Sequence, residues 1–423
     1  MRFLPAMAAL LLAVLPAFAE GEGTGGRPAP PRVRPGDGVT ALVGADVYTV
    51  SGPVYRRGTV LVRDGKIWKA GVDLAVPEGA RVIDCAGKRI LPGYIAADAE
   101  PIGLVQGGVR PGSLYRDCLD PFSRLNEIAL GSGITALFNA SMNRGFWTAQ
   151  SAVIRPALGD AARMVVKENA AVWVNWPRGS ATDRMQFEEM LRQGEKFLRD
   201  SEEARRLKKE PPKQGPSPEI LALLRREIPV RIPALRKEEI LDSIRLAETH
   251  NLRLVVEDAL EAWLVAEPLA RIGATSVVTP RNKSRNPAVE GPNGGNIQVA
   301  GILEKAGARF CLQPPGGPGM IGGGITMGGL AGRDLMDLPI EGCFAIRGGA
   351  SEAEVLRSMT LGAAEALCVA DRIGSIDPGK DADLIVVDGD PFHYRTVVDM
   401  AFIEGKLLYE RSKSTLFRDL PGR

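Results

Sequence analysis

Between residues 93 and 372, short β-type runs alternate with segments that have helical periodicity. The six clearest runs are Ile134–Phe138, Ala170–Val174, Val230–Ile232, Leu252–Val256, Thr275–Val278 and Ala308–Leu312. Helical patterns such as Lys237–His250 and Glu352–Cys368 intervene. A parallel sheet with crossover helices requires this alternation, and a barrel is the closed form of such a sheet.

The segments on either side, residues 39–92 and 373–412, contain only strand and turn patterns. In the first, apolar runs are broken by turn residues, and Asp64-Gly65 is a typical hairpin dipeptide. In the second, Asp383–Asp388 and Val397–Phe402 repeat the same pattern. Local pattern alone does not say whether the two segments pair.

Several motifs carry a resemblance to one family. Ile373–Leu384, with its Asp-Pro-Gly-Lys-Asp-Ala-Asp-Leu ending, resembles the C-terminal signature of the amidohydrolase superfamily, and Leu91–Glu100 resembles its first barrel strand. Residues 177–185 and 228–232 are similar to the branch near imidazolonepropionase. The resemblance implies an α/β fold: a (β/α)8 TIM barrel over 93–372 and a composite β-sandwich built from 39–92 and 373–412.

The residues at the family's metal-binding positions differ from those that the resemblance implies. In the first barrel strand, two positions that hold histidine in the family carry Asp98 and Glu100. In the fifth strand, the histidine positions carry Pro233 and Leu235, and in the sixth Asp258 replaces a histidine. Zinc favours nitrogen and sulfur ligands, so we expect no standard zinc centre.

The remaining candidates for a standard centre are also missing. The acid that binds metal at the end of the family's eighth strand aligns with Pro314 or Pro315. The whole chain has two histidines, His250 and His393, and five scattered cysteines without a Cys-x-x-Cys pair. No serine has a histidine partner within a plausible triad, and the catalytic residues stay unassigned.

Two interpretations of the acids stay open. Asp98, Glu100 and Asp258, with Glu257 or Asn139 as further donors, offer oxygen atoms that suit Mg²⁺, Mn²⁺ or Ca²⁺. Alternatively, the acids pair with basic side chains in an ion-pair network, and the barrel holds no cofactor. The basic candidates are Arg236, Arg281 and Lys283, which together with Asn139 are also our candidates for substrate binding.

The N-terminus predicts export. Arg2, the apolar run Ala8–Leu15 and Ala17-Phe18-Ala19 form the three parts of a signal peptide over residues 1–19. Residues 20–38 are a flexible lead-in rich in Gly and Pro, and 413–423 form a C-terminal tail. The apolar run is too short to cross a bilayer, so we expect a periplasmic or secreted protein without a membrane anchor.

Composition limits the partners. The formal net charge is +2, and acids and bases are mixed along the chain, so nothing favours binding to nucleic acid. A small-molecule ligand fits a barrel, and the sequence is silent on oligomeric state. We expect a catalytically impaired ligand-binding or interaction protein. The alternative is an active amide or cyclic-amide hydrolase that uses a carboxylate-held metal.

Overall fold

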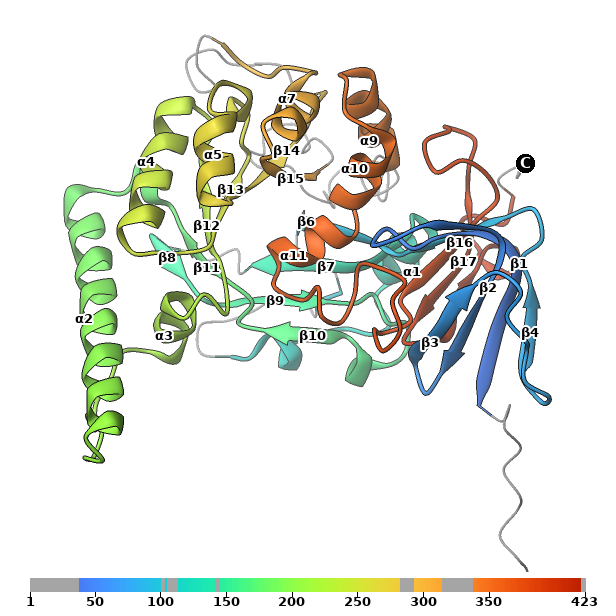
Figure 1. The fold of residues 1–423 in the computed structure, drawn as a ribbon, viewed down its shortest axis with the longest axis horizontal. Helices are drawn as coiled ribbons and strands as arrows, with labels where there is room; N and C mark the ends of the chain where they lie inside the picture. The colour runs from blue at the N-terminus through green and yellow to red at the C-terminus, as the bar shows by residue number, and fades with distance from the viewer. Residues whose placement is uncertain are drawn as a thin grey trace, which may run out of the picture.

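The computed structural model describes residues 38–99, 103–104, 113–140, 145–281, 293–313 and 338–419. The predicted signal peptide and nearly all of the lead-in lie outside these residues. Figure 1 shows a mixed α/β molecule in which the helices α4, α5, α7, α9 and α10 lie on one side, and the N- and C-terminal strands lie together at one end. Within the described residues, no helix is long and apolar enough to cross a membrane.

The N- and C-terminal segments form one eight-stranded sheet, as the resemblance implied. Its strands are β1 (Val39–Tyr48), β2 (Val54–Arg63), β3 (Lys66–Gly71), β4 (Arg81–Asp84), β5 (Arg89–Pro92), β16 (Leu384–Val387), β17 (Val398–Ile403) and β18 (Lys406–Glu410). The hydrogen-bonded order is β18-β17-β16-β5-β1-β2-β3, and β4 pairs with β1. The junction is the antiparallel pair of β5 and β16, with Leu384 opposite Pro92. A two-layer sandwich is visible only in part.

The remaining strands form two separate sheets. One has the order β10-β9-β7-β6, from β6 (Tyr94–Ala99), β7 (Ile134–Ala140), β9 (Ser151–Ile154) and β10 (Val165–Glu168). The other has the order β15-β14-β13-β12-β11-β8, from β8 (Trp147–Thr148), β11 (Val172–Val174), β12 (Val230–Pro233), β13 (Leu254–Glu257), β14 (Thr275–Val278) and β15 (Arg309–Leu312). Strands β11 to β15 are parallel to one another.

The expected closed barrel is not present in the described part of the chain. Strands β6 and β15 approach each other, but no ladder of hydrogen bonds joins the two sheets there. On the other side, β7 pairs with β9 in antiparallel orientation rather than with the next parallel strand. Strands β8, β9 and β10 therefore interrupt the strand–helix alternation.

The described helices are α1 (Arg124–Gly131), α2 (Ala181–Arg206), α3 (Pro218–Leu224), α4 (Lys237–Thr249), α5 (Ala266–Ile272), α7 (Val299–Lys305), α9 (Leu338–Arg347), α10 (Glu352–Ser358) and α11 (Leu361–Ala366). Helices α3, α4, α7, α9, α10 and α11 contact strands of the parallel sheet, whereas α1 packs against β7, β17 and β18. The single helix expected over Glu352–Cys368 is two helices. The carbonyl of Met359 accepts the backbone N–H of Ile95 in β6, so the chain breaks its helix there to bond the strand.

The parallel strands have two buried faces. Val172, Val230, Ile232 and Val256 belong to the core that includes residues of α2, α4 and α5. Ile95, Ala97, Phe138, Val255 and Cys311 belong to a second core between the two sheets. Burial on both faces explains why these strands read as continuous apolar runs rather than as alternating ones.

The glycine of the Pro-Gly pair before the first barrel strand, Gly93, lies in close contact with β7. A Cβ atom at Gly93 would lie 1.9 Å from Oγ1 of Thr135 in β7. The backbone of β6 therefore enters beside β7 only because this position has no side chain.

A buried ion-pair network joins the eight-stranded sheet to β9. Arg155 follows β9, and its Nε donates to Oδ2 of Asp383 at 2.7 Å while Nη2 donates to Oδ2 of Asp381 at 2.5 Å. Its Nη1 donates to Glu404 at 2.8 Å. Burial favours the neutral form of both aspartates and raises the pKa of Asp383, but at Asp381 the hydrogen bonds from Lys66 and Arg155 outweigh it and lower the pKa. The Asp-Ala-Asp part of the signature thus holds the two parts of the fold together.

Candidate functional site

Arg231 is a charged residue in the middle of the parallel sheet. It lies on β12, in register with Trp173 on β11 and Val255 on β13. Its neighbours Val230 and Ile232 pack in the core on the helix side. Because side chains alternate along a strand, Arg231 points to the opposite face, into the space between the two sheets, where its side chain is fully buried.

Glu257, the last residue of β13, balances this charge. Its Oε1 accepts a hydrogen bond from Nε of Arg231 at 2.6 Å, and its Oε2 accepts one from Nε1 of Trp173 at 2.9 Å. Both residues of the ion pair are buried. The carboxylate therefore has a donor on each oxygen, and the Arg231–Glu257 pair is a charge-assisted contact in a medium of low dielectric.

The same guanidinium reaches across to the other sheet. Nη2 of Arg231 donates to the carbonyl oxygen of Ala97 in β6 at 2.8 Å. The guanidinium carbon lies 4.0 Å from the centroid of the Phe138 ring in β7. One side chain thus links β6 and β7 with β12 and β13, where no ladder closes the barrel. Nη1, in contrast, is buried, and no atom of the described residues accepts a hydrogen bond from it.

The loops after β12 and β13 carry few side chains that can bind a metal. Pro233 ends β12, and Leu235 follows it in a buried position. Both are apolar at the end of the strand. Asp258 follows β13, is half-buried, and has a φ of 51°, in the left-handed region.

Acidic side chains fill the N-terminal end of α4. Oε2 of Glu239 accepts the backbone N–H groups of Leu235 at 2.8 Å and of Arg236 at 3.2 Å. Oε2 of Glu261 accepts the backbone N–H of Lys237 at 2.9 Å. The amides that would otherwise attract an anion at this helix end are therefore bonded to carboxylates of the chain itself.

The structure brings few of the sequence candidates together. Arg281 donates through Nε to Oε2 of Glu341 at 2.6 Å and through its backbone N–H to Oε1 at 2.7 Å, so it holds α9. Asn139 is fully buried and alternates with Phe138, which puts it on the face of β7 away from Arg231. Lys283, Glu100 and the side chain of Asp98 lie outside the described residues.

The buried ion pair of the described strands involves an arginine that the sequence reasoning missed, and the pairing predicted for Asp98, Glu100 and Asp258 stays a prediction. Arg231, not Arg236, Arg281 or Lys283, pairs with Glu257. One signal was available: an arginine within the run Val-Arg-Ile-Pro is the only charged residue of an otherwise apolar strand. A charge in a fully buried strand needs a partner, and that partner had to lie on a neighbouring strand.

Cys311 and His250 lie in surroundings that do not activate them for catalysis. Burial raises the pKa of the Cys311 thiol to about 12, so the reactive thiolate is disfavoured at neutral pH. Nδ1 of His250, at the end of α4, lies 2.8 Å from Oε1 of Glu195 in α2. Neither group has the arrangement of an activated nucleophile or base.

The divalent metal that the resemblance implies does not fit the described strand ends. Pro233 and Leu235 have no ligand atom, and each oxygen of Glu257 accepts a hydrogen bond from the protein. Among the described residues, no group of three or more His, Cys, Asp or Glu side chains is arranged to hold a metal. Asp258 alone is not a site.

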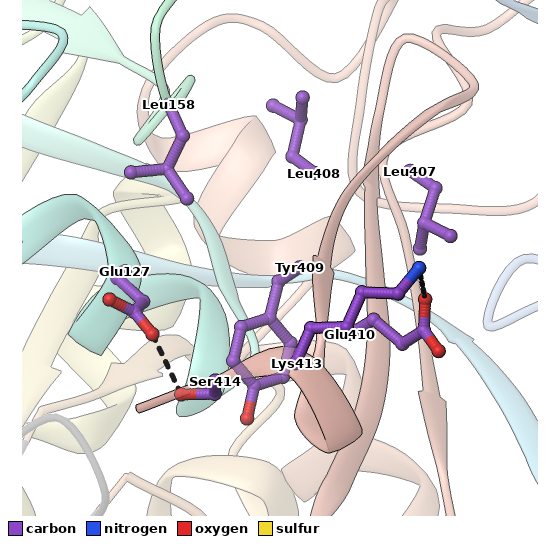
Figure 2. Close-up of a pocket in the computed structure, with 8 residues that line it drawn as sticks. All are labelled: Glu127, Leu158, Leu407, Leu408, Tyr409, Glu410, Lys413 and Ser414. Carbon is purple, nitrogen blue, oxygen red and sulfur yellow. Dashed lines mark hydrogen bonds and ion pairs between the residues drawn. The ribbon is translucent and has the colours of Figure 1, made fainter. Parts of the chain in front are cut away.

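A separate pocket of about 190 Å³ lies between α1, β18 and the turn that follows it (Figure 2). In it, Oγ of Ser414 donates to Oε1 of Glu127 at 2.7 Å, and Lys413 pairs with Glu410 at 2.6 Å. Burial strongly raises the pKa of Tyr409, so its phenol stays neutral. This pocket shares no residue with the strand ends, and its own polar groups are largely paired with one another.

Comparison with known proteins agrees with this architecture. The sequence profile of the amidohydrolase family matches residues 227–408, which run from just before β12 to β18 and include the Asp-Ala-Asp signature. These residues are similar to the amidohydrolase family and make up a little less than half of the chain. The matched region contains Arg231 and Glu257 but neither Asp98 nor Glu100. No curated protein matches the chain.

Solved structures are similar to the chain over a longer span. An amidohydrolase from Thermotoga maritima is 26% identical, with a TM-score of 0.69, covering 88% of this chain and 100% of that one. Two others share the fold at lower identity. Molinate hydrolase is 19% identical with a TM-score of 0.54, covering 91% of this chain and 98% of its own. A prolidase described as putative, from Bifidobacterium longum, is 17% identical with a TM-score of 0.55, covering 88% and 95%.

Proposed function

We propose that this amidohydrolase-family protein is a catalytically impaired ligand-binding or interaction protein. The observation that carries the proposal is the pair of Arg231 and Glu257. A metal-dependent hydrolase needs an open coordination position and ligands that are free to bind it. Here the carboxylate at the end of β13 is engaged by Arg231 and by the Trp173 indole.

The position of Arg231 strengthens this argument. A fixed guanidinium carries a permanent positive charge, so it opposes a divalent cation placed beside it. The resemblance to the imidazolonepropionase-related branch assigns histidines to the positions of Pro233 and Leu235, and both are now apolar. Export through the N-terminal segment and the absence of a resident cofactor belong to the same proposal.

A second function deserves a test. Asp258 is half-buried at the end of β13, where an oxygen ligand would have to lie. With Asp98 and Glu100 it would supply a hard-metal site for Mg²⁺, Mn²⁺ or Ca²⁺, and the protein would then hydrolyse amides or cyclic amides. Arg236, Lys283 and Asn139 stay candidates for binding that substrate, whereas Arg281 is engaged by Glu341.

Metal uptake separates the two functions. Equilibrium dialysis of the purified protein against Zn²⁺, Mn²⁺, Mg²⁺ or Ca²⁺, followed by elemental analysis, should show the same low metal content in wild type and in a triple variant with Asp98→Ala, Glu100→Ala and Asp258→Ala. If wild type retains one equivalent of a metal that the triple variant loses, the impaired-enzyme proposal fails. A lone Glu238→Ala variant, an exposed acid on α4, is the matched control for a change of surface charge.

A further inference from the structure

Another cavity lies where the ion-pair network of Arg155 reaches the surface. It has a volume of about 460 Å³ and is lined by Asp64, Gly65, Lys66, Arg163, Arg372, Asp381 and Glu404. Apart from Gly65, every lining residue is charged, so the lining offers no apolar side chain to hold a hydrophobic ligand. The cavity shares no residue with the ends of β12 and β13 or with the pocket in Figure 2.

Two hairpin turns hold the rim of this cavity in place. Asp64-Gly65 joins β2 to β3, and Glu404-Gly405 joins β17 to β18. A Cβ atom at Gly65 would lie 3.0 Å from the carbonyl oxygen of Glu404, so the two turns are in close contact. The backbone N–H of Ala382 donates to the carbonyl of Gly65 at 2.9 Å, and the N–H of Gly405 donates to the carbonyl of Ala382 at 2.9 Å. The charged side chains on these turns therefore extend from a fixed backbone.

Two carboxylates in the wall of the cavity already have basic partners. Glu404 accepts hydrogen bonds from Arg155 on one oxygen and from Arg163 on the other, both at 2.8 Å. Asp381 accepts hydrogen bonds from three basic side chains, which are Lys66, Arg155 and Arg372. Each of these two acids is thus bonded to more than one positive charge.

The basic side chains, in contrast, have more N–H groups than these acids accept. Arg163 donates through Nε to Asp160 and through Nη1 to Glu404, both at 2.8 Å, and no described atom accepts a hydrogen bond from its Nη2. Nζ of Lys66 has three hydrogens and one described acceptor, Asp381. The side chains of Lys66 and Arg163 are 49% and 34% exposed, so a ligand can reach them.

We infer that this cavity binds the phosphate group of a small soluble molecule between Lys66 and Arg163. A phosphate monoester brings three acceptor oxygens and no donor, and guanidinium and ammonium groups are the side chains that bind such oxygens. The volume lies in the range of small-molecule sites, about 300–1,000 Å³, so it leaves room for an organic part beside the phosphate. A lipid headgroup is disfavoured, because the lining has no apolar side chain to enter a bilayer.

The charges around the cavity are balanced in favour of an anion, except for Asp64. Five basic side chains form the network, which are Lys66, Arg155, Arg163, Arg372 and Lys406, and they pair with four acids, which are Asp160, Asp381, Asp383 and Glu404. Burial raises the pKa of Asp383, which adds to this excess of positive charge. Asp64 lines the cavity and forms no ion pair with a described residue, so its charge opposes the phosphate.

Glycerol 3-phosphate is the test ligand, and its ³¹P resonance reports binding to the full-length protein. We expect the resonance to shift saturably at fixed ionic strength, and we expect sulfate but not glycerol to displace the ligand. Absence of a saturable shift, or displacement by glycerol, would overturn the inference. The protein should not sediment with vesicles that contain phosphatidic acid. A protein that binds these vesicles but not glycerol 3-phosphate recognises a lipid headgroup, which also contradicts the inference.

Two substitutions in the lining should change the affinity in opposite directions. Arg163→Gln removes the unused Nη2 and should weaken binding by about tenfold, as loss of a charge-assisted hydrogen bond does. Asp64→Asn removes the opposing charge and should tighten binding about twofold to fivefold, and asparagine tolerates the left-handed φ of 53° at this position. Arg192→Gln, at an exposed arginine of α2, is the matched control and should bind as wild type does. Equal affinities of Arg163→Gln and Arg192→Gln, or weaker binding by Asp64→Asn, would show that the phosphate does not bind in this cavity.

Discussion

Replacement of Arg155 by methionine is expected to lower the free energy of unfolding by about 3–5 kcal/mol. The substitution leaves Asp381 and Asp383 buried, and Asp383 then loses its only ion-pair partner among the described residues. Methionine fills much of the same volume, so the loss reports the uncompensated carboxyl of Asp383 rather than a cavity, while Asp381 keeps Lys66 and Arg372 as partners. Urea unfolding followed by tryptophan fluorescence measures it.

The control for Arg155 is an exposed ion pair. Arg192 on α2 pairs with Glu188 one turn away, and its side chain is 55% exposed. Arg192→Met should cost about 0.5 kcal/mol or less, as surface pairs of this kind do. A loss of about 1 kcal/mol or less in Arg155→Met would show that the network does not hold the two parts of the fold together.

The difference in free energy of unfolding between wild type and Arg155→Met depends on pH, and the direction follows from the pKa shifts of the two aspartates. The folded pKa of Asp381 is lowered, so its contribution is present above the unfolded pKa of about 4 and is lost as the pH falls through the folded value. The raised pKa of Asp383 acts in the opposite sense, because burial favours its protonated form. The gap between wild type and Arg155→Met should therefore narrow in acid, where both carboxyls are neutral.

Replacement of Glu257 by alanine is expected to cost a similar amount, about 3–5 kcal/mol, because it leaves the Arg231 charge buried without a counter-ion. The double variant Arg231→Met with Glu257→Leu should be more stable than Glu257→Ala, since two apolar side chains replace the whole pair. Unfolding of the single and double variants by urea supplies the comparison. The double variant is also compared with Arg231→Met alone and Glu257→Leu alone. If its loss in free energy of unfolding equals the sum of the losses in these two single variants, the two side chains are not coupled.

Much of the fold could be predicted because the information is local. The run Thr275–Val278 is a strand with the predicted bounds, and Lys237–Thr249 is a helix one residue shorter than expected. The pairing of β5 with β16 could not be predicted from local pattern, because 291 residues lie between the end of β5 at Pro92 and the start of β16 at Leu384. It came from the resemblance.

The elements that the sequence did not predict depend on tertiary contacts. Strand β9 is a short apolar run between polar residues, and it is a strand because β7 and β10 pair with it on both sides. The helix expected over Glu352–Cys368 breaks where the carbonyl of Met359 bonds Ile95, far away in the sequence. Local propensity does not include partners that are distant in the sequence, so it cannot predict these elements.

The site was less predictable for the same reason. The resemblance to the family pointed to Asp98, Glu100 and Asp258, because it compares the residues of each strand separately and does not show which side chains meet. The pairs that the structure brings together, Arg231 with Glu257 and Arg281 with Glu341, join residues 26 and 60 positions apart. Burial of Arg231 was a sequence signal, but the identity of its partner needed the register of β12 and β13.

Hydrolysis of amides is the measurement that tests the central claim most directly. N-acyl amino acids, dipeptides and an imidazolone-type compound are incubated with wild type and with Asp98→Ala, each with and without added Zn²⁺ or Mn²⁺. The account predicts no hydrolysis above that of the buffer with the same metal, in either protein. A rate in wild type that a chelator removes and that Asp98→Ala lacks would contradict it.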